Sequence, residues 1–112
     1  LRSNVRLTEA QQQEAVLIYE QTIRGAFREV SDALIAYRKT REVSQQQKLL
    51  ADSAQDATRL SQLRYSGGAS SYLEVLTNDT NYFSAELALV QAQLDAQLAL
   101  VQLYKSLGGG WQ

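Results

Sequence analysis

Between Arg64 and Glu74 the sequence reads RYSGGASSYLE, and this stretch decides the fold. Gly67 and Gly68 supply the left-handed backbone conformations with which helices commonly end. Ser71 and Glu74 follow with the spacing S-x-x-E, which predicts a capping box: Ser71 accepts from the N–H near Glu74, and the Glu74 side chain returns the bond. One helix is expected to end and another to begin within a connection of about five residues, which usually makes the two helices antiparallel neighbours.

The segment before this turn has the pattern of one long helix over residues 7–65. Apolar residues recur at steps of three and four, which marks one face of a helix. Thr8 and Gln11 form a possible capping box at its start, so residues 1–6 are expected to be a lead-in. The apolar face consists of Val16, Tyr19, Ile23, Phe27, Val30, Leu34 and Tyr37.

Beyond Tyr37 the apolar face continues with smaller side chains. Small residues let a neighbouring helix approach closely, as in a helical wall or a coiled coil, and a solvent-facing stretch fits this segment equally well. Gly25, inside the long face, is interpreted as a close packing contact. The weaker part of the face comprises Ser44, Leu50, Ala54, Ala57 and Leu60.

After the turn, which spans residues 66–71, residues 72–107 are expected to form a helix with two apolar stripes on different sides. A two-helix hairpin buries one stripe per helix, so the second stripe needs partners that this chain does not contain. The glycine run Gly108 to Gly110 predicts a helix stop, with residues 108–112 as a tail. One stripe contains Leu73, Leu76, Phe83, Leu87, Val90, Leu94, Val101 and Tyr104, and the other contains Val75, Tyr82, Ala85, Leu89, Ala92, Ala96 and Leu103.

The composition lacks the residue types that most often catalyse reactions or bind soft metals. The 112 residues include no His and no Cys, so the commonest general base, nucleophile and soft metal ligand are missing. We therefore predict a protein that is not an enzyme and has no catalytic residue, metal site or cofactor. The 11 basic and 12 acidic residues are mixed along the chain, which disfavours nucleic-acid binding. The first residue is Leu and no Met occurs, which indicates a segment of a larger protein.

The turn differs in kind from the rest of the chain. Arg64 and Tyr65 come just before the glycines and Tyr72 just after them, so a guanidinium and two phenol rings converge on one loop. Arg and Tyr are enriched at binding hot spots. In the alternative interpretation, Arg64 caps carbonyls at its own helix end and the rings brace the turn. The residues favour neither interpretation.

The turn and its flanks resemble the TolC/OprM family of outer-membrane efflux channels. Residues 64–76 resemble the family's periplasmic tip motif, R-Y-x-x-G-x-x-S-x-x-[DE]-V-L, and residues 26–34, 84–92 and 103–111 resemble the helices beside it. The resemblance covers essentially the whole chain but only the last part of a family subunit. It implies an all-α fold: a long antiparallel two-helix coiled-coil hairpin, the second repeat of the subunit, within a trimeric α-barrel.

The resemblance also implies a function and a location. Arg64, Tyr65, Gly67, Gly68 and Ser71 would lie at the tip that docks a periplasmic adaptor (membrane fusion) protein, and through it the inner-membrane pump, for export of small molecules. The full-length protein would be a homotrimer in the outer membrane of a Gram-negative bacterium, with its α-barrel in the periplasm. Its membrane contact would come only from a β-barrel outside this chain.

Glu74 takes the position where relatives often have a carboxylate that joins a ring at the closed pore mouth, so the resemblance implies a pore gate. Repeated about a threefold axis, such charges attract cations and repel one another. Where relatives often have a second acid three residues on, this chain has Thr77. Two alternatives from another class remain: a stand-alone coiled-coil interaction module, and a hairpin of the adaptor itself.

Overall fold

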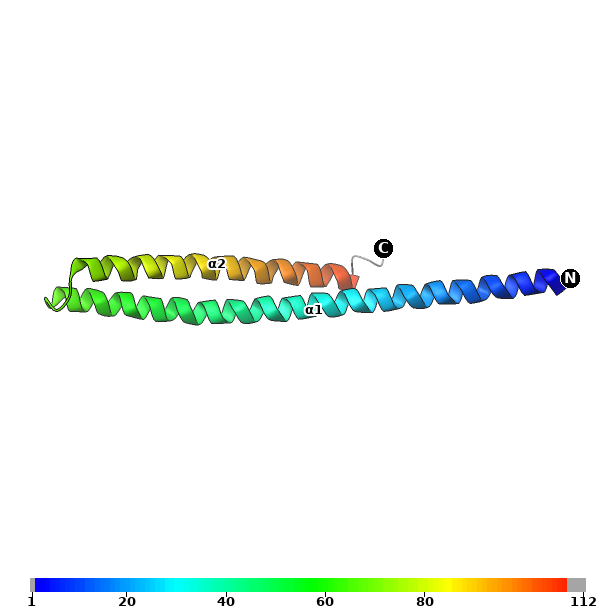
Figure 1. Cartoon of the computed structure of the whole chain (residues 1–112), viewed down its shortest axis with the longest axis horizontal. Helices are drawn as coiled ribbons and strands as arrows, with labels where there is room; N and C mark the ends of the chain where they lie inside the picture. Colours follow the sequence, from blue (N-terminus) through cyan, green and yellow to red (C-terminus); the bar gives the residue numbers. More distant parts are fainter. Residues whose placement is uncertain (1, 109–112) are drawn as a thin grey trace.

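The computed structural model describes residues 2–108, which form an antiparallel hairpin of two helices (Figure 1). Helix α1 spans Arg2–Ser66 and helix α2 spans Tyr72–Gly108. The rod measures 100 × 18 × 14 Å. Its length is that of α1 alone, because 65 residues rising about 1.5 Å each extend about 100 Å. The predicted all-α hairpin is confirmed.

The start of α1 differs from the prediction. Residues 2–6, expected to be a lead-in, are helical. The hydroxyl of Thr8 donates to the carbonyl of Asn4 at 2.9 Å, a bond to the preceding turn that forms inside a helix. The capping box predicted from Thr8 and Gln11 is therefore wrong. At the other end, Gly108 is the last residue of α2, and residues 109–112 of the predicted tail lie outside the described residues.

Backbone hydrogen bonds end α1 at the paired glycines. The N–H of Ala69 donates to the carbonyl of Arg64 at 2.8 Å, and the N–H of Gly68 donates to the carbonyl of Tyr65 at 3.0 Å. This pair of bonds is the Schellman motif, which requires a left-handed residue just past the helix end. Gly68 supplies it with a φ of 78°. The chain reverses there because glycine adopts this conformation without a Cβ clash.

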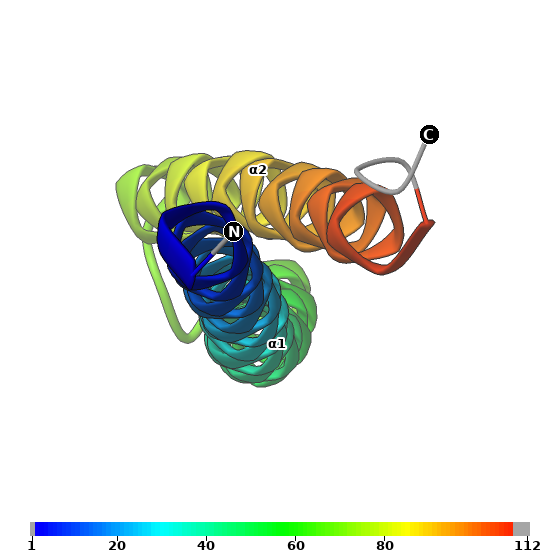
Figure 2. The ribbon, with the colours of Figure 1, turned by 90° about the vertical axis from the view of Figure 1, so that its right-hand side faces the viewer.

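The two helices meet along one continuous seam that has the heptad spacing of coiled coils. Every member is buried or half-buried, and successive members lie alternately three and four positions apart. Figure 2 looks along the rod and shows the helices inclined to each other. This interhelical seam comprises Ala26, Val30, Ala33, Tyr37, Thr40, Ser44, Gln47, Ala51, Ala54, Thr58 and Ser61 of α1, and Val75, Asn78, Tyr82, Ala85, Leu89, Ala92, Ala96, Ala99, Leu103 and Ser106 of α2.

Small side chains dominate the interhelical seam. Its buried apolar residues are Ala33, Ala51, Val75 and Ala92, and its buried polar residues are Thr58 and Ser61. Among these six only Val75 has a large apolar side chain. Small residues let helix backbones approach closely, so the hairpin is held by proximity of the two backbones and not by a thick hydrophobic core.

Several expectations for α1 need correction. Ala57, placed on the apolar face, is exposed, and so are Val16, Tyr19 and Phe27. Leu50 and Leu60, placed on the buried face, are 57% and 54% exposed. The two helices pair with the coiled-coil repeat of 3.5 residues per turn. The residues that face α2 are therefore the alanines, serines and threonines of the seam. A Cβ built on Gly25 would meet no heavy atom within 4 Å. Gly25 therefore makes no close packing contact within the hairpin.

One apolar stripe of α2 packs against α1, and the other is exposed to solvent. The stripe with Val75, Tyr82 and Leu89 forms α2's side of the seam. The other stripe is exposed along its whole length, with exposed fractions from 45% at Leu76 to 72% at Leu73. This outer stripe comprises Leu73, Leu76, Phe83, Leu87, Val90, Leu94, Val101 and Tyr104. Within residues 2–108 no segment covers it.

Replacing Gly68 with Ala should lower the free energy of unfolding by about 1–2 kcal/mol, because a Cβ in the left-handed region costs about that much. Gly67→Ala is the matched control, since its Cβ would lie 3.6 Å from the Leu63 carbonyl oxygen, an ordinary contact, and we expect little change. Urea unfolding followed by circular dichroism measures both. Equal losses for the two variants would contradict the Schellman geometry.

Val75→Ala should destabilise the hairpin by about 1.5–2.5 kcal/mol, from two buried methyl groups at about 0.8 kcal/mol each and the cavity they leave. Val75 is 5% exposed, whereas Val90, on the outer stripe, is 61% exposed. Val90→Ala is therefore the control, with an expected change of about 0.5 kcal/mol or less in a monomeric hairpin. The comparison fails if Val90→Ala is the more damaging variant at low protein concentration.

Candidate functional site

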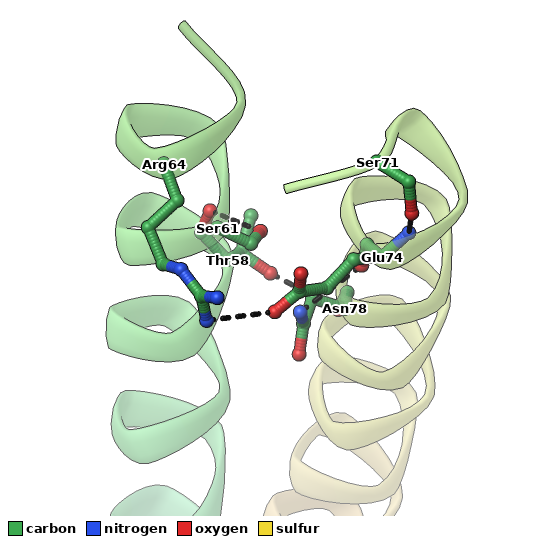
Figure 3. Close-up of polar contacts among 6 residues, drawn as sticks. All are labelled: Thr58, Ser61, Arg64, Ser71, Glu74 and Asn78. Atoms are coloured by element: carbon green, nitrogen blue, oxygen red, sulfur yellow. Dashed lines mark hydrogen bonds and ion pairs between the residues drawn. The ribbon is translucent and has the colours of Figure 1, made fainter. Parts of the chain in front are cut away.

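Figure 3 shows the end of the rod at which the chain reverses. Arg64 lies on the last turn of α1 and Glu74 on the first turn of α2. Gly67 and Gly68 form the loop between the helices, and Ser71 immediately precedes α2. The hairpin therefore gathers the residues singled out in the sequence, together with Tyr65, at one tip. We call residues 64–74 the tip.

An ion pair joins the two helices across the tip. Nη1 of Arg64 donates to Oε1 of Glu74 at 3.1 Å (Figure 3). The side chains are 58% and 38% exposed, so water screens their attraction and the pair contributes about 0.2–1 kcal/mol at most. Arg64 therefore pairs with Glu74 across the turn, which differs from the capping of its own helix end. The bond is weak enough for another carboxylate to replace it.

The capping box at the start of α2 forms in one direction. The N–H of Glu74 donates to the hydroxyl of Ser71 at 3.4 Å (Figure 3), as predicted for Ser71. The expected return bond from the Glu74 side chain is wrong, because that carboxylate turns to Arg64 instead. A full charge on Arg64 attracts a carboxylate more strongly than a backbone N–H does.

Two aromatic rings flank the loop. The ring centroids of Tyr65 and Tyr72 lie 5.5 Å apart, with the ring planes at 53°, a tilted contact of the kind that aromatic pairs favour. The rings brace the turn, as one interpretation predicted. They are also accessible, because Tyr65 is 48% and Tyr72 is 56% exposed, so bracing and binding are compatible.

A polar contact below the tip links the helices and was missed from the sequence. Thr58 Oγ1 donates to the carbonyl of Asn78 on α2 at 3.0 Å, and Ser61 Oγ donates to the carbonyl of Thr58 at 2.9 Å. Asn78 Nδ2 in turn donates to the carbonyl of Glu74. Hydrophobicity does not single these residues out in the sequence, because their side chains are small and polar. Counting the heptad onward from Ala54 would have found Thr58 and Ser61.

One seam residue has a displaced pKa. The Glu86 carboxylate favours the protonated phenol of Tyr82 as a hydrogen-bond donor, and partial burial and the negative charges of Glu86 and Asp52 act in the same direction. Together they raise the pKa of Tyr82 above its usual value near 10. Tyr82 therefore stays neutral through the physiological pH range, and this part of the seam gains no charge there.

The tip offers recognition chemistry: a guanidinium, a carboxylate, two phenol rings and a loop of small residues. Among residues 2–108 no three His, Cys, Asp or Glu side chains lie where they could hold a metal ion. In the same range, neither helix has a stretch long and apolar enough to cross a membrane.

The family comparison assigns the chain clearly. A family model described as outer membrane efflux protein matches residues 1–109. The outer membrane protein OprJ of Pseudomonas aeruginosa is 40% identical over 110 residues, which are 98% of this chain and 23% of that protein. The solvent efflux pump outer membrane protein SrpC of Pseudomonas putida is 41% identical, over 99% of this chain and 24% of that protein.

A further relative and a solved structure agree with the match to the outer membrane efflux protein family. The cation efflux system protein CusC of Escherichia coli O6:H1 is 38% identical, over 99% of this chain and 24% of that protein. A crystal structure of a membrane protein from Pseudomonas aeruginosa superposes with a TM-score of 0.68 and 38% identity, over 96% of this chain and 25% of that one. The chain thus spans about a quarter of the length of these relatives. SrpC and CusC are efflux proteins and not enzymes. The chain belongs to the family of outer membrane efflux proteins.

Proposed function

We propose that this chain is a periplasmic hairpin of an outer-membrane efflux channel, that its tip docks a periplasmic adaptor, and that Glu74 contributes to the pore gate for export of small molecules. The single observation that carries the proposal is the pair of apolar stripes on opposite sides of α2. Family membership favours the channel over the alternatives of an adaptor hairpin or a stand-alone coiled coil.

The outer stripe of α2 supports a position in a wall of helices. Leu73, Leu76, Phe83 and Leu87 lie on it at positions that follow the three-and-four spacing of the interhelical seam, with Thr80 in place of an apolar residue between Leu76 and Phe83. At about 103° per residue in a coiled coil, the two stripes point roughly 150° apart. A helix with two such faces needs a neighbour on each side, which the helices of a closed α-barrel have. Large exposed apolar surfaces of this kind mark interaction sites.

The proposed channel is a homotrimer, as the family resemblance implies, and the two apolar faces of α2 fit an assembly in which helices of different subunits and repeats lie side by side. The hairpin alone exposes apolar residues from Leu73 at the tip to Tyr104 near the open end. Burying them would stabilise the assembly by about 1.5–3 kcal/mol for each large side chain that becomes fully covered. The rod would then stand in the periplasm, and an inner-membrane pump would be reached through the adaptor.

The tip supports docking through its accessible side chains. Tyr65 and Tyr72 are about half exposed and Leu73 is 72% exposed, while Gly67 and Gly68 bring no side chain to the loop. A partner can therefore approach the loop backbone closely and bury aromatic rings beside it, as at binding hot spots. The weak Arg64–Glu74 pair adds a guanidinium that can exchange its carboxylate partner.

A gate at Glu74 would differ from a ring of free carboxylates. Glu74 is half-buried and pairs with Arg64 in the same hairpin, so each subunit would bring a neutralised pair to the pore mouth. Thr77 adds no charge, and its hydroxyl donates to the carbonyl of Leu73. The ring would become strongly negative when Arg64 turns to another partner, because like charges around a threefold axis then lack compensation.

Site-directed cross-linking tests the docking. In the assembled pump, Cys placed at Ser66 or Ala69 of the channel should form cross-links with a Cys at the hairpin tip of the cognate adaptor. Gln55→Cys is the control, because Gln55 is exposed on α1 but lies below the tip. Cross-links from Gln55 as strong as those from Ala69, or none from the tip, would sink the docking proposal.

A charge swap tests whether Arg64 contacts the adaptor or only stabilises the turn through Glu74. Arg64→Glu combined with Glu74→Arg keeps the ion pair within the hairpin, but it reverses the favourable charge at the end of α1 and at the start of α2, so the free energy of unfolding should fall by about 0.6–2 kcal/mol. The partner, however, meets reversed charges. We expect the swap to lose tip cross-linking and drug export severalfold, while the hairpin stays folded by circular dichroism. Full export by the swapped channel would show that Arg64 only braces the turn.

A further inference from the structure

The outer stripe of α2 has the same pattern of apolar and polar residues in both directions. Its eight residues, with Thr80 and Gln97 filling the two gaps in the spacing, occupy ten positions from Leu73 to Tyr104 at alternating steps of three and four. Thr80 is the third position from one end, and Gln97 is the third position from the other. All ten residues are exposed in the hairpin. The stripe is therefore a palindrome in its chemistry.

A palindromic stripe matches an antiparallel copy of itself. When two α2 helices run in opposite directions about a twofold axis midway between Leu87 and Val90, each coiled-coil layer pairs one position with its counterpart from the other end. Thr80 then lies opposite Gln97 of the second copy, and every other layer is apolar on both sides. These apolar layers pair Leu73 with Tyr104, Leu76 with Val101, Phe83 with Leu94, and Leu87 with Val90.

We propose that the outer stripe is a self-complementary interface through which two copies of this chain pair antiparallel along α2. The one polar layer fixes the register, as polar residues in coiled-coil seams do, because a shift by one heptad leaves Thr80 and Gln97 opposite apolar residues. The hydroxyl of Thr80 donates to the carbonyl of Leu76. It can still accept a hydrogen bond from the amide of Gln97, which satisfies the layer when it is buried.

Charge and shape favour the antiparallel over the parallel arrangement. Three of the four acidic residues of α2 lie in its first half, and Lys105, its one basic residue, lies near its end. Antiparallel pairing sets opposite ends of the two helix dipoles together and brings the acidic half of one copy beside the end with Lys105 of the other. A parallel pair would stack the acidic halves and place Phe83 against Phe83. The three acidic residues are Glu74, Asp79 and Glu86.

The outer stripe is large enough for a stable pair. Burying roughly 60–100 Å² from each of its eight side chains removes on the order of 1,000–1,600 Å² from water in two copies, and specific interfaces bury about 1,200–2,000 Å². The pairing does not rest on the adaptor or the gate. A wall helix covers the same face in the proposed channel, so the pairing is expected of the 112-residue chain alone, and its failure would leave the channel proposal untouched.

Sedimentation equilibrium of the 112-residue chain tests the interface, and we expect a reversible equilibrium of monomer and dimer. Leu87→Asp should raise the dissociation constant roughly 100-fold or more, because each dimer loses two leucines at its centre and would bury two unpaired charges. Leu50→Asp on α1 is the matched control, since Leu50 and Leu87 are both 57% exposed, and it should change nothing. A chain that stays monomeric or forms trimers would overturn the proposal. So would equal effects of the two variants with helix content preserved by circular dichroism.

Disulfide exchange tests the direction and register of the pair, because the chain has no Cys of its own. In an equimolar mixture of Thr80→Cys and Gln97→Cys chains in a glutathione buffer, the disulfide between the two different variants should predominate. Ser53→Cys, at an exposed position of α1, mixed with Gln97→Cys is the control and should give a statistical mixture. A parallel pair would instead link each variant to itself. That result, or a statistical mixture from Thr80→Cys and Gln97→Cys, would refute the antiparallel interface.

Discussion

Close approach of two helix backbones along the interhelical seam is the constraint on which the rest of the structure depends. The seam is lined mostly by Ala, Ser and Thr, and Val75 is its one buried residue with a large apolar side chain. Such a seam is stabilised by close shape complementarity and by a few hydrogen bonds between the helices, such as the one from Thr58 to the carbonyl of Asn78, more than by buried apolar area. It fixes the register of the helices, and thereby brings Arg64 opposite Glu74.

A thin seam has a consequence for function. Most large apolar side chains of α2 are left outside the hairpin, including Phe83, Leu87 and Tyr104. A single hairpin of this kind buries little of its surface for a chain of its length. Exposed apolar surfaces of this extent mark interaction sites, and the chain amounts to about a quarter of its relatives. An independent globular domain would hide those residues itself.

The tip combines a fixed turn with an ion pair whose side chains can change partners. The Schellman bonds fix the loop backbone, and the ring pair of Tyr65 and Tyr72 packs against it. The Arg64–Glu74 pair is exposed and weak by comparison. A binding surface benefits from this division, because the backbone is preorganised before a partner arrives and only one ion pair has to rearrange.

The sequence by itself determined where the chain turns and that both segments are helical, because Gly67, Gly68 and Ser71 act through local backbone chemistry. It also determined that α2 has two apolar stripes. Only the tertiary structure decided which stripe meets α1, since both have the same spacing and α1 contributes small residues that hydrophobicity does not single out. The partner of Glu74 was decided in the same way: its carboxylate was expected to cap α2, but the antiparallel register brings Arg64 within 3.1 Å of it. Contacts between residues distant in sequence depend on that register, which no local pattern contains.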